Sequence, residues 1–189
     1  MQAMKAFRKD VKVAYEGCGT LWKLSAHKRN RELLGMQTAW TAALKAMKSS
    51  PTSKEEVQLN GCDAILNLSA ENTNREKMGE TAASWQAVMT AFADLKEVPS
   101  NGCGAIWNLA MNDKNREEMG KSGAWLPVLT AMTRFSKSET ARVKGLGALL
   151  NLSAHNEWKS EYMGAAAPWV QVRAAMAGFP TTESMQIRG

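Results

Sequence analysis

Residues 61–70 read GCDAILNLSA, and this stretch returns three times in recognisable form along the 189-residue chain. The other copies read GCGTLWKLSA at residues 17–26, GCGAIWNLAM at 102–111 and GLGALLNLSA at 145–154. Self-similarity at a period of 41 to 44 residues is typical of proteins whose stacked units bury their apolar faces against one another. The sequence therefore predicts one array over residues 1–189, with copies anchored at Gly17, Gly61, Gly102 and Gly145 and the next anchor at Gly189.

Two further blocks accompany each copy. An Asn-Arg-Glu triplet occupies residues 30–32, 74–76 and 115–117, and it degenerates to WKSE at 158–161. A glycine follows each of these blocks, at Gly35, Gly79, Gly120 and Gly164, and a tryptophan follows five or six residues later, at Trp40, Trp85, Trp125 and Trp169. We expect the asparagine to be the N-cap of a short helix and the tryptophans to be buried between repeats.

The apolar spacing within the blocks is helical. After Gly120, apolar residues recur at intervals of three and four, at Trp125, Val128, Leu129, Met132 and Phe135. Pro127 falls in the first turn of this helix, where its missing N–H costs nothing. The linker before Gly102 is about one turn short, and Pro99 predicts a late start for the next helix. Since no stretch alternates with period two, the chain is predicted to be all-α.

Composition and motifs exclude several classes of protein. The 24 basic and 18 acidic residues give a net charge of only +6, and no nucleic-acid module is recognisable, so we expect no nucleic-acid partner. No apolar run is long enough to span a membrane. The three cysteines, Cys18, Cys62 and Cys103, form no CxxC pair, so we expect small buried residues and neither a disulfide framework nor a metal site.

Other absences concern catalysis and compartment. The sequence has no phosphate-binding glycine loop and no HExxH motif, and its Ser, His and Asp residues are accounted for by the repeat pattern. We therefore expect a non-enzymatic protein without cofactor or bound metal. The N-terminus lacks the apolar core of a secretory signal, although residues 1–13 hold four basic residues and one acid. An intracellular location, cytoplasmic or nuclear, is the default expectation, with an organelle not excluded.

The repeat unit resembles the armadillo family, and the likeness spans essentially the whole chain. Its carriers are the Gly-Cys-x-Ala-Ile/Leu-x-Asn-Leu-Ser/Ala stretch and the Asn-Arg-Glu block. The resemblance implies an α-solenoid, a right-handed superhelix of about four three-helix repeats, whose long third helices line a concave groove. Both ends of the chain cut through a repeat, so we expect the array to continue further or its ends to be covered by other chains.

In armadillo proteins, the asparagine that closes the third helix binds the backbone of extended peptides. The matching positions are Asn67, Asn108 and Asn151, with Lys23 in the first copy. The alternative is that this asparagine only satisfies backbone groups at a helix end. Importin-α carries a tryptophan four residues earlier, where this chain has Gly19, Asp63, Gly104 and Gly147. The pattern is thus similar to a β-catenin-like or vacuolar-armadillo-like groove and not to importin-α.

A row of basic residues occupies a second repeated position, at Arg31, Arg75, Arg116 and Lys159. The β-catenin-like pattern implies that these residues contact ligand carboxylates through charge-assisted bonds. The alternative is a solvated pair with the adjacent glutamate, which contributes little. Trp22 and Trp107 lie one residue before the asparagine position and are candidates for partial exposure in the groove.

These residues lead to two hypotheses about function. The first is a protein–protein interaction scaffold that binds an extended, acidic polypeptide along its concave groove. The second is a structural subunit, or a fragment of a longer armadillo array, embedded in a large multiprotein assembly and contacting neighbouring subunits.

Overall fold

The structure, a computed structural model, describes residues 1–7, 9–50, 54–80, 83–94 and 100–154, together with the single positions 173 and 177. Within these residues all regular structure is helical, which confirms the prediction of an all-α chain. The helices are α1 (Gln2–Ala6), α2 (Val11–Ser25), α3 (Lys28–Met36), α4 (Trp40–Ser49), α5 (Glu55–Leu68), α6 (Asn72–Gly79), α7 (Ala83–Asp94), α8 (Ser100–Leu109), α9 (Asp113–Lys121), α10 (Trp125–Arg134) and α11 (Glu139–Ser153).

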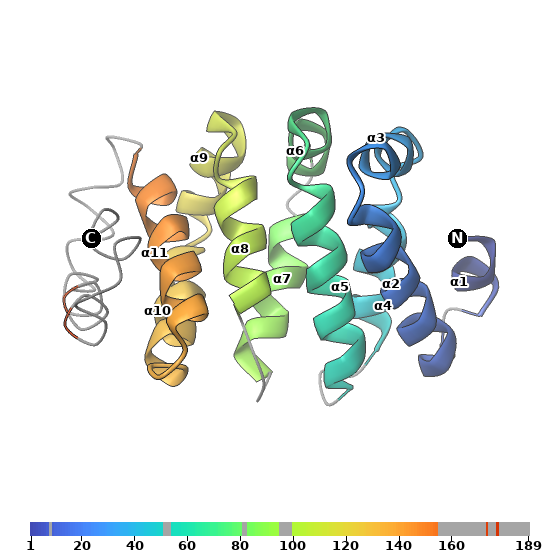
Figure 1. Cartoon of the computed structure of the whole chain (residues 1–189), viewed down its shortest axis with the longest axis horizontal. Coiled ribbons are helices and arrows are strands. Elements are labelled where there is room, and N and C mark those ends of the chain that lie inside the picture. Colours follow the sequence, from blue (N-terminus) through green and yellow to red (C-terminus); the bar gives the residue numbers. More distant parts are fainter. Residues whose placement is uncertain are drawn as a thin grey trace.

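The helices lie in three rows (Figure 1). The front row consists of α2, α5, α8 and α11 side by side, and each of these helices packs against the next. A rear row of α4, α7 and α10 lies behind it, and the short helices α3, α6 and α9 lie across one end. The four anchor glycines all fall in the front row, so each row collects one of the three sequence blocks.

The core lies between the front and rear rows. Trp40, Trp85 and Trp125, at the starts of the rear-row helices, are buried as the sequence predicts, whereas Trp169 lies outside the described residues. The three cysteines are also buried and free, one in each of α2, α5 and α8. These residues fill equivalent places in successive units, which explains their periodic recurrence.

Three methionines lie directly over anchor glycines. A Cβ atom at the glycine would come within about 2.5 Å of the methionine side chain in the pairs Met4–Gly17, Met47–Gly61 and Met132–Gly145. Each methionine belongs to the helix that precedes the front-row helix along the chain, namely α1, α4 and α10. Thus the anchor is glycine at these places because a flexible thioether occupies the space that a side chain would need.

The predicted place of Pro127 in its helix is confirmed. The late helix start predicted from Pro99 falls on residues 95–99, which lie outside the described residues; the described part of α8 spans Ser100–Leu109. Pro127 is the third residue of α10 and lies within its first turn. Among the described helices, none combines the length and the apolar character that crossing a membrane requires.

The prediction that the Asn-Arg-Glu asparagine is an N-cap is wrong. Asn30, Asn74 and Asn115 are each the third residue of their short helix, and the N-cap positions belong to His27, Glu71 and Asn112. The physical reason is that the asparagine amides bond to other helices. Asn74 Nδ2 donates to the Leu68 carbonyl at the end of α5, at 3.0 Å, and to the Arg31 carbonyl in the preceding short helix, at 3.1 Å.

Candidate functional site

Three asparagines form a ladder across the front row. Each lies in the last turn of its helix and donates through Nδ2 to a carbonyl in the last turn of the preceding front-row helix. The bonds run from Asn67 to Trp22 (3.2 Å), from Asn108 to Leu66 (3.1 Å) and from Asn151 to Trp107 (3.0 Å). Carbonyls in the last turn of a helix have no N–H partner within it. The ladder gives the Trp107 carbonyl a donor from the next unit and adds a second donor to the Trp22 and Leu66 carbonyls, which also accept from the hydroxyls of Ser25 and Ser69.

The same ladder leaves half of each amide unused. An asparagine side chain has two N–H donors and one oxygen acceptor. Among the described residues, the Oδ1 atoms of Asn67, Asn108 and Asn151 accept no hydrogen bond, and all three side chains are partly exposed. Lys23, at the matching position in α2, is exposed. The three asparagines therefore bond to backbone carbonyls at helix ends, which is the alternative that the sequence left open. Their Oδ1 atoms can still accept hydrogen bonds from a ligand.

An apolar stripe runs parallel to the ladder, one residue before it in each helix. Its members are Trp22 in α2, Leu66 in α5, Trp107 in α8 and Leu150 in α11. Trp22 is 38% exposed and Leu150 is 52% exposed, while Leu66 and Trp107 are half-buried. Only the two tryptophans were predicted from the sequence to be partly exposed here. The shared repeat position would have identified the two leucines as well.

A polar chain crosses three front-row helices near the ladder. Lys144 Nζ in α11 donates to Asn101 Oδ1 in α8 at 2.6 Å, and Asn101 Nδ2 donates to Asp63 Oδ1 in α5. Gly104 leaves room for the lysine, since a Cβ there would lie 3.3 Å from Lys144 Cδ. Burial raises the pKa of Asp63, against the opposing effects of the Asn101 bond and the Lys144 charge. Burial also lowers the pKa of Lys144.

The three predicted arginines lie at the ends of the front-row helices. Arg31 Nη1 donates to the carbonyls of Ser25 and Ala26, and Arg75 Nη1 to those of Ser69 and Ala70. Cations at helix C-termini are favoured by the open carbonyls and by the helix dipole. Arg116 Nη1 makes the equivalent contact with the Ala110 carbonyl at 3.5 Å. These guanidinium groups therefore close helix ends within the chain.

Acidic and amide side chains complete the arginine contacts. Arg31 Nε pairs with Glu71 of the next unit at 3.0 Å, Arg116 Nη2 pairs with Asp113 at 2.5 Å, and Arg75 Nη2 donates to Asn72 Oδ1. Arg31 and Arg116 keep about a fifth of their side-chain surface exposed, whereas Arg75 is buried. Burial lowers the pKa of Arg75, and the charges of Glu71 and Glu76 oppose this. Lys159 lies outside the described residues.

The cysteines have the chemistry of buried, unreactive thiols. Burial raises the pKa of Cys18 and of Cys103 to about 12, and it raises the pKa of Cys62 as well. A thiol becomes a nucleophile or a metal ligand only as the thiolate. In the part of the chain that the structure describes, no cluster of three or more His, Cys, Asp or Glu side chains is placed to hold a metal ion.

Comparison with protein-family models, with curated proteins and with solved structures finds no match to this chain.

Proposed function

We propose that the chain is a non-enzymatic protein-interaction scaffold of the armadillo type. In this proposal the helices form a right-handed solenoid of about four repeats, and the front row faces a concave groove that binds an extended polypeptide. The observation that carries the proposal is the half-used asparagine ladder beside the apolar stripe.

The two features complement an extended peptide. Its backbone N–H groups can donate to the open Oδ1 atoms of Asn67, Asn108 and Asn151, while its apolar side chains lie against the stripe. Packed helices lie about 8–10 Å apart and an extended chain rises about 3.3 Å per residue, so about three ligand residues span one repeat. A ligand that reaches from Trp22 to Leu150 would thus contain about nine residues.

The proposed preference for acidic ligands has a narrower basis. Lys23 is exposed in the first copy, and Arg31 and Arg116 each present a partly exposed edge beside the row. The net charge of +6 favours association with acidic segments in general. Because the arginines already bond to helix ends and acids, we propose that acidity modulates affinity and that the ladder and stripe supply most of it.

A matched pair of variants tests the surface. The double variant Trp22→Gln/Leu150→Gln removes the two most exposed members of the stripe, and Leu33→Gln/Met36→Gln changes two exposed apolar residues on α3. We expect an array of extended decapeptides, graded in apolar content and acidity, to bind the wild-type chain. The stripe variant should bind at least about tenfold more weakly, because two apolar contacts are lost, and the α3 variant should bind normally.

Recognition of the peptide backbone by the asparagines can be tested separately from recognition of peptide side chains. Asn108→Ala should weaken all binding peptides by a similar factor, because the amide contacts the peptide backbone and not its side chains. If no peptide binds the folded wild-type chain, or if the stripe variant binds as well as the wild type, the scaffold proposal is wrong.

The second candidate function is that of a structural subunit in a large assembly. Large apolar side chains are also exposed away from the front row, including Met36 at 76%, Leu33 at 51% and Leu126 at 50%. If Leu33→Gln/Met36→Gln releases the chain from a native complex in size-exclusion chromatography while Trp22→Gln/Leu150→Gln does not, this candidate is favoured.

A further inference from the structure

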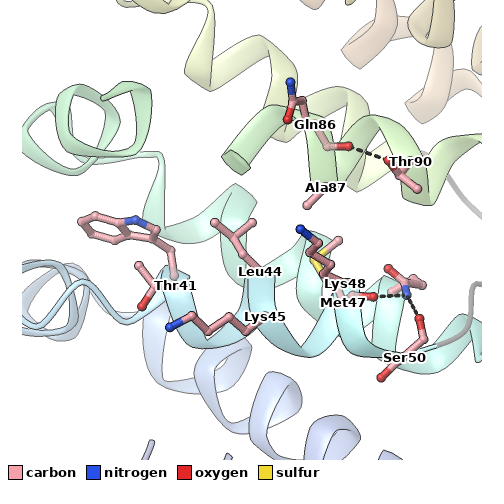
Figure 2. Close-up of a pocket in the computed structure, with 11 residues that line it drawn as sticks. Thr41, Leu44, Lys45, Met47, Lys48, Ser50, Gln86, Ala87 and Thr90 are labelled. Atoms are coloured by element: carbon pink, nitrogen blue, oxygen red, sulfur yellow. Dashed lines mark hydrogen bonds between the residues drawn. The ribbon is translucent and has the colours of Figure 1, made fainter. Parts of the chain in front are cut away.

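A cavity of about 600 Å³ lies between the rear-row helices α4 and α7, away from the asparagine ladder. Its lining is mostly apolar, with Trp40, Leu44 and Met47 contributed by α4 and Ala87 by α7. Figure 2 shows the side chains of Leu44 and Lys48 directed from α4 toward Ala87. A volume of this size is within the range of small-molecule sites, which are typically apolar with a few polar groups.

On the α7 side, the cavity is lined by Gln86 and by two short side chains. Ala87 and Thr90 line the α7 wall, and the Thr90 hydroxyl donates to the Gln86 carbonyl in its own helix at 2.9 Å. That hydroxyl is therefore satisfied and adds little polarity to the wall. On the other side of α4, the space next to α1 is lined by Met4 and Phe7 and measures only about 20 Å³.

Lys45 and Lys48 give the rim of the cavity a positive charge. Both side chains are exposed on α4, and neither forms an ion pair with any residue that the structure describes. Among the described residues, no acidic side chain lines the cavity. At one end of the cavity, Nε2 of the buried Gln58 donates hydrogen bonds to the carbonyls of Met47 and Ser50, at 3.0 and 3.4 Å. The cavity thus combines an apolar interior with cations that nothing in the described chain neutralises.

We propose that this cavity binds a small amphipathic carboxylate of the fatty-acid type. The apolar tail lies between Leu44, Met47 and Ala87, and the carboxylate pairs with Lys45 or Lys48 at the rim. An anion is favoured by the two unpaired ammonium groups, and a flexible tail fits a cavity whose walls include an adaptable methionine. The proposal is independent of peptide binding on the front row, because the residues of the two surfaces do not overlap.

Calorimetric titration of the folded chain with three ten-carbon probes tests the proposal. Decanoate, decanol and decyltrimethylammonium share a tail and differ in charge, and all are used below the concentration at which they form micelles. We expect decanoate to bind about fivefold or more tightly than decanol, because a partly exposed ion pair contributes modestly, and the cation to bind most weakly. Across shorter carboxylates, affinity should rise about fourfold per added methylene until the cavity is filled.

Two pairs of variants locate the binding. Thr90→Leu fills the cavity and should weaken decanoate and decanol alike by at least about tenfold, since the tail loses its space. Thr130→Leu, at the equivalent place in α10, is its control. Lys45→Gln/Lys48→Gln should reduce decanoate affinity to that of decanol, while Lys77→Gln/Lys114→Gln, two exposed lysines elsewhere, should leave it unchanged.

A photolabel gives a measurement that does not depend on variant folding. Decanoate carrying a diazirine should label peptides from α4 and α7, as mapped by mass spectrometry. The proposal is overturned if the folded wild type binds no probe, if decanol binds as tightly as decanoate, or if the label maps to other helices. It is also overturned, in favour of a protein partner, if an octapeptide ending in a leucine carboxylate binds more tightly than decanoate.

Discussion

Two sets of asparagines link neighbouring units, and they differ in how fully their amides are used. The buried asparagines, Asn74 and Asn115, are 2% and 1% exposed and donate twice each through Nδ2. The surface asparagines, Asn67, Asn108 and Asn151, are partly exposed and donate once each. Both sets bond backward to the preceding unit. Burial, and not residue type, therefore separates a purely structural amide from one with capacity left for a ligand.

The buried set also dictates the residue that it packs against. A Cβ atom at Gly35 or Gly79 would overlap the amide of Asn74 or Asn115 of the next unit. Asn115 Oδ1 is buried and accepts no hydrogen bond from the described residues, and it lies against the Gly79 backbone. Gly35 and Gly79, which end the first two Asn-Arg-Glu blocks, are thus explained by the asparagines that begin the following blocks.

The largest effect is expected from Asn115→Ala. The change removes two hydrogen bonds and leaves the carbonyls of Arg75 and Leu109 without these donors. We expect a loss of about 2–4 kcal/mol in the free energy of unfolding, because two buried hydrogen bonds of about 0.5–1.5 kcal/mol each are lost together with the packing of a buried side chain. Urea denaturation measures it, with Lys114→Ala, an exposed neighbour, as the control that changes stability by less than about 0.5 kcal/mol.

The second prediction is that alanine substitution has opposite consequences for stability at two helical glycines, Gly79 and Gly104. Gly79→Ala forces a methyl group against the Asn115 amide and should cost about 1–3 kcal/mol through overpacking. At Gly104 a methyl group would meet only the flexible ends of Leu66 and Lys144, at 3.0 and 3.3 Å. Gly104→Ala should therefore change stability little or raise it by up to about 1 kcal/mol. Thermal denaturation of both variants tests the pair, and equal losses would contradict the explanation for Gly79.

Asn108→Ala should cost less than Asn115→Ala, about 1 kcal/mol or below. The Leu66 carbonyl that Asn108 contacts also accepts from the Ser69 hydroxyl at 2.9 Å, and Asn108 itself is partly exposed, so water can replace the lost donor. The same urea denaturation measures it. If Asn108→Ala destabilises the chain as much as Asn115→Ala does, the distinction between the two sets fails.

The smallest effect concerns pH. Burial raises the pKa of Asp63 above its ordinary value of 3.8. The folded chain therefore keeps this proton where the unfolded chain has lost it, and the contribution of Asp63 to stability falls as pH rises from that value through the raised pKa. Asp63→Asn removes the fall and keeps an oxygen for Asn101. Between pH 4 and 7 the variant should gain on the wild type by less than about 1 kcal/mol.

Urea denaturation at several pH values measures this difference. Glu80→Gln, which changes an exposed carboxylate at the end of α6, is the control and should show no comparable gain. A variant that becomes less stable relative to the wild type as pH rises would reverse the assigned sign.

Structural features could be predicted from the sequence where the same residue type occupies the same position in each copy. The helical spacing after Trp125, the buried tryptophans and the buried cysteines all follow from periodic apolar positions. The role of the Asn-Arg-Glu asparagine did not follow, because an amide at the start of a helix can cap its own N-terminus or bond to another helix. Sequence spacing alone does not separate these two uses.

The chain of Asp63, Asn101 and Lys144 was missed for a different reason. Asn101 has a counterpart of the same type in Asn60, but neither Asp63 nor Lys144 recurs at its repeat position, so the repeat does not reveal the chain. The cavity between α4 and α7 was missed because helical spacing shows which residues face a neighbouring helix and not how much space remains between the two helices. The polar chain depends on residues that differ between copies, whereas the comparison of copies finds what they share.

The backward direction of the ladder has a consequence during synthesis on the ribosome. The Trp107 carbonyl near the end of α8 accepts from Asn151, which is made 44 residues later, whereas the Trp22 and Leu66 carbonyls also accept from the hydroxyls of Ser25 and Ser69 in their own units. Because a chain emerges N-terminus first, the Trp107 carbonyl lacks this donor until α11 has left the exit tunnel. Pausing of translation between α8 and α11 would therefore leave this helix end without its donor, and continuous elongation would supply it.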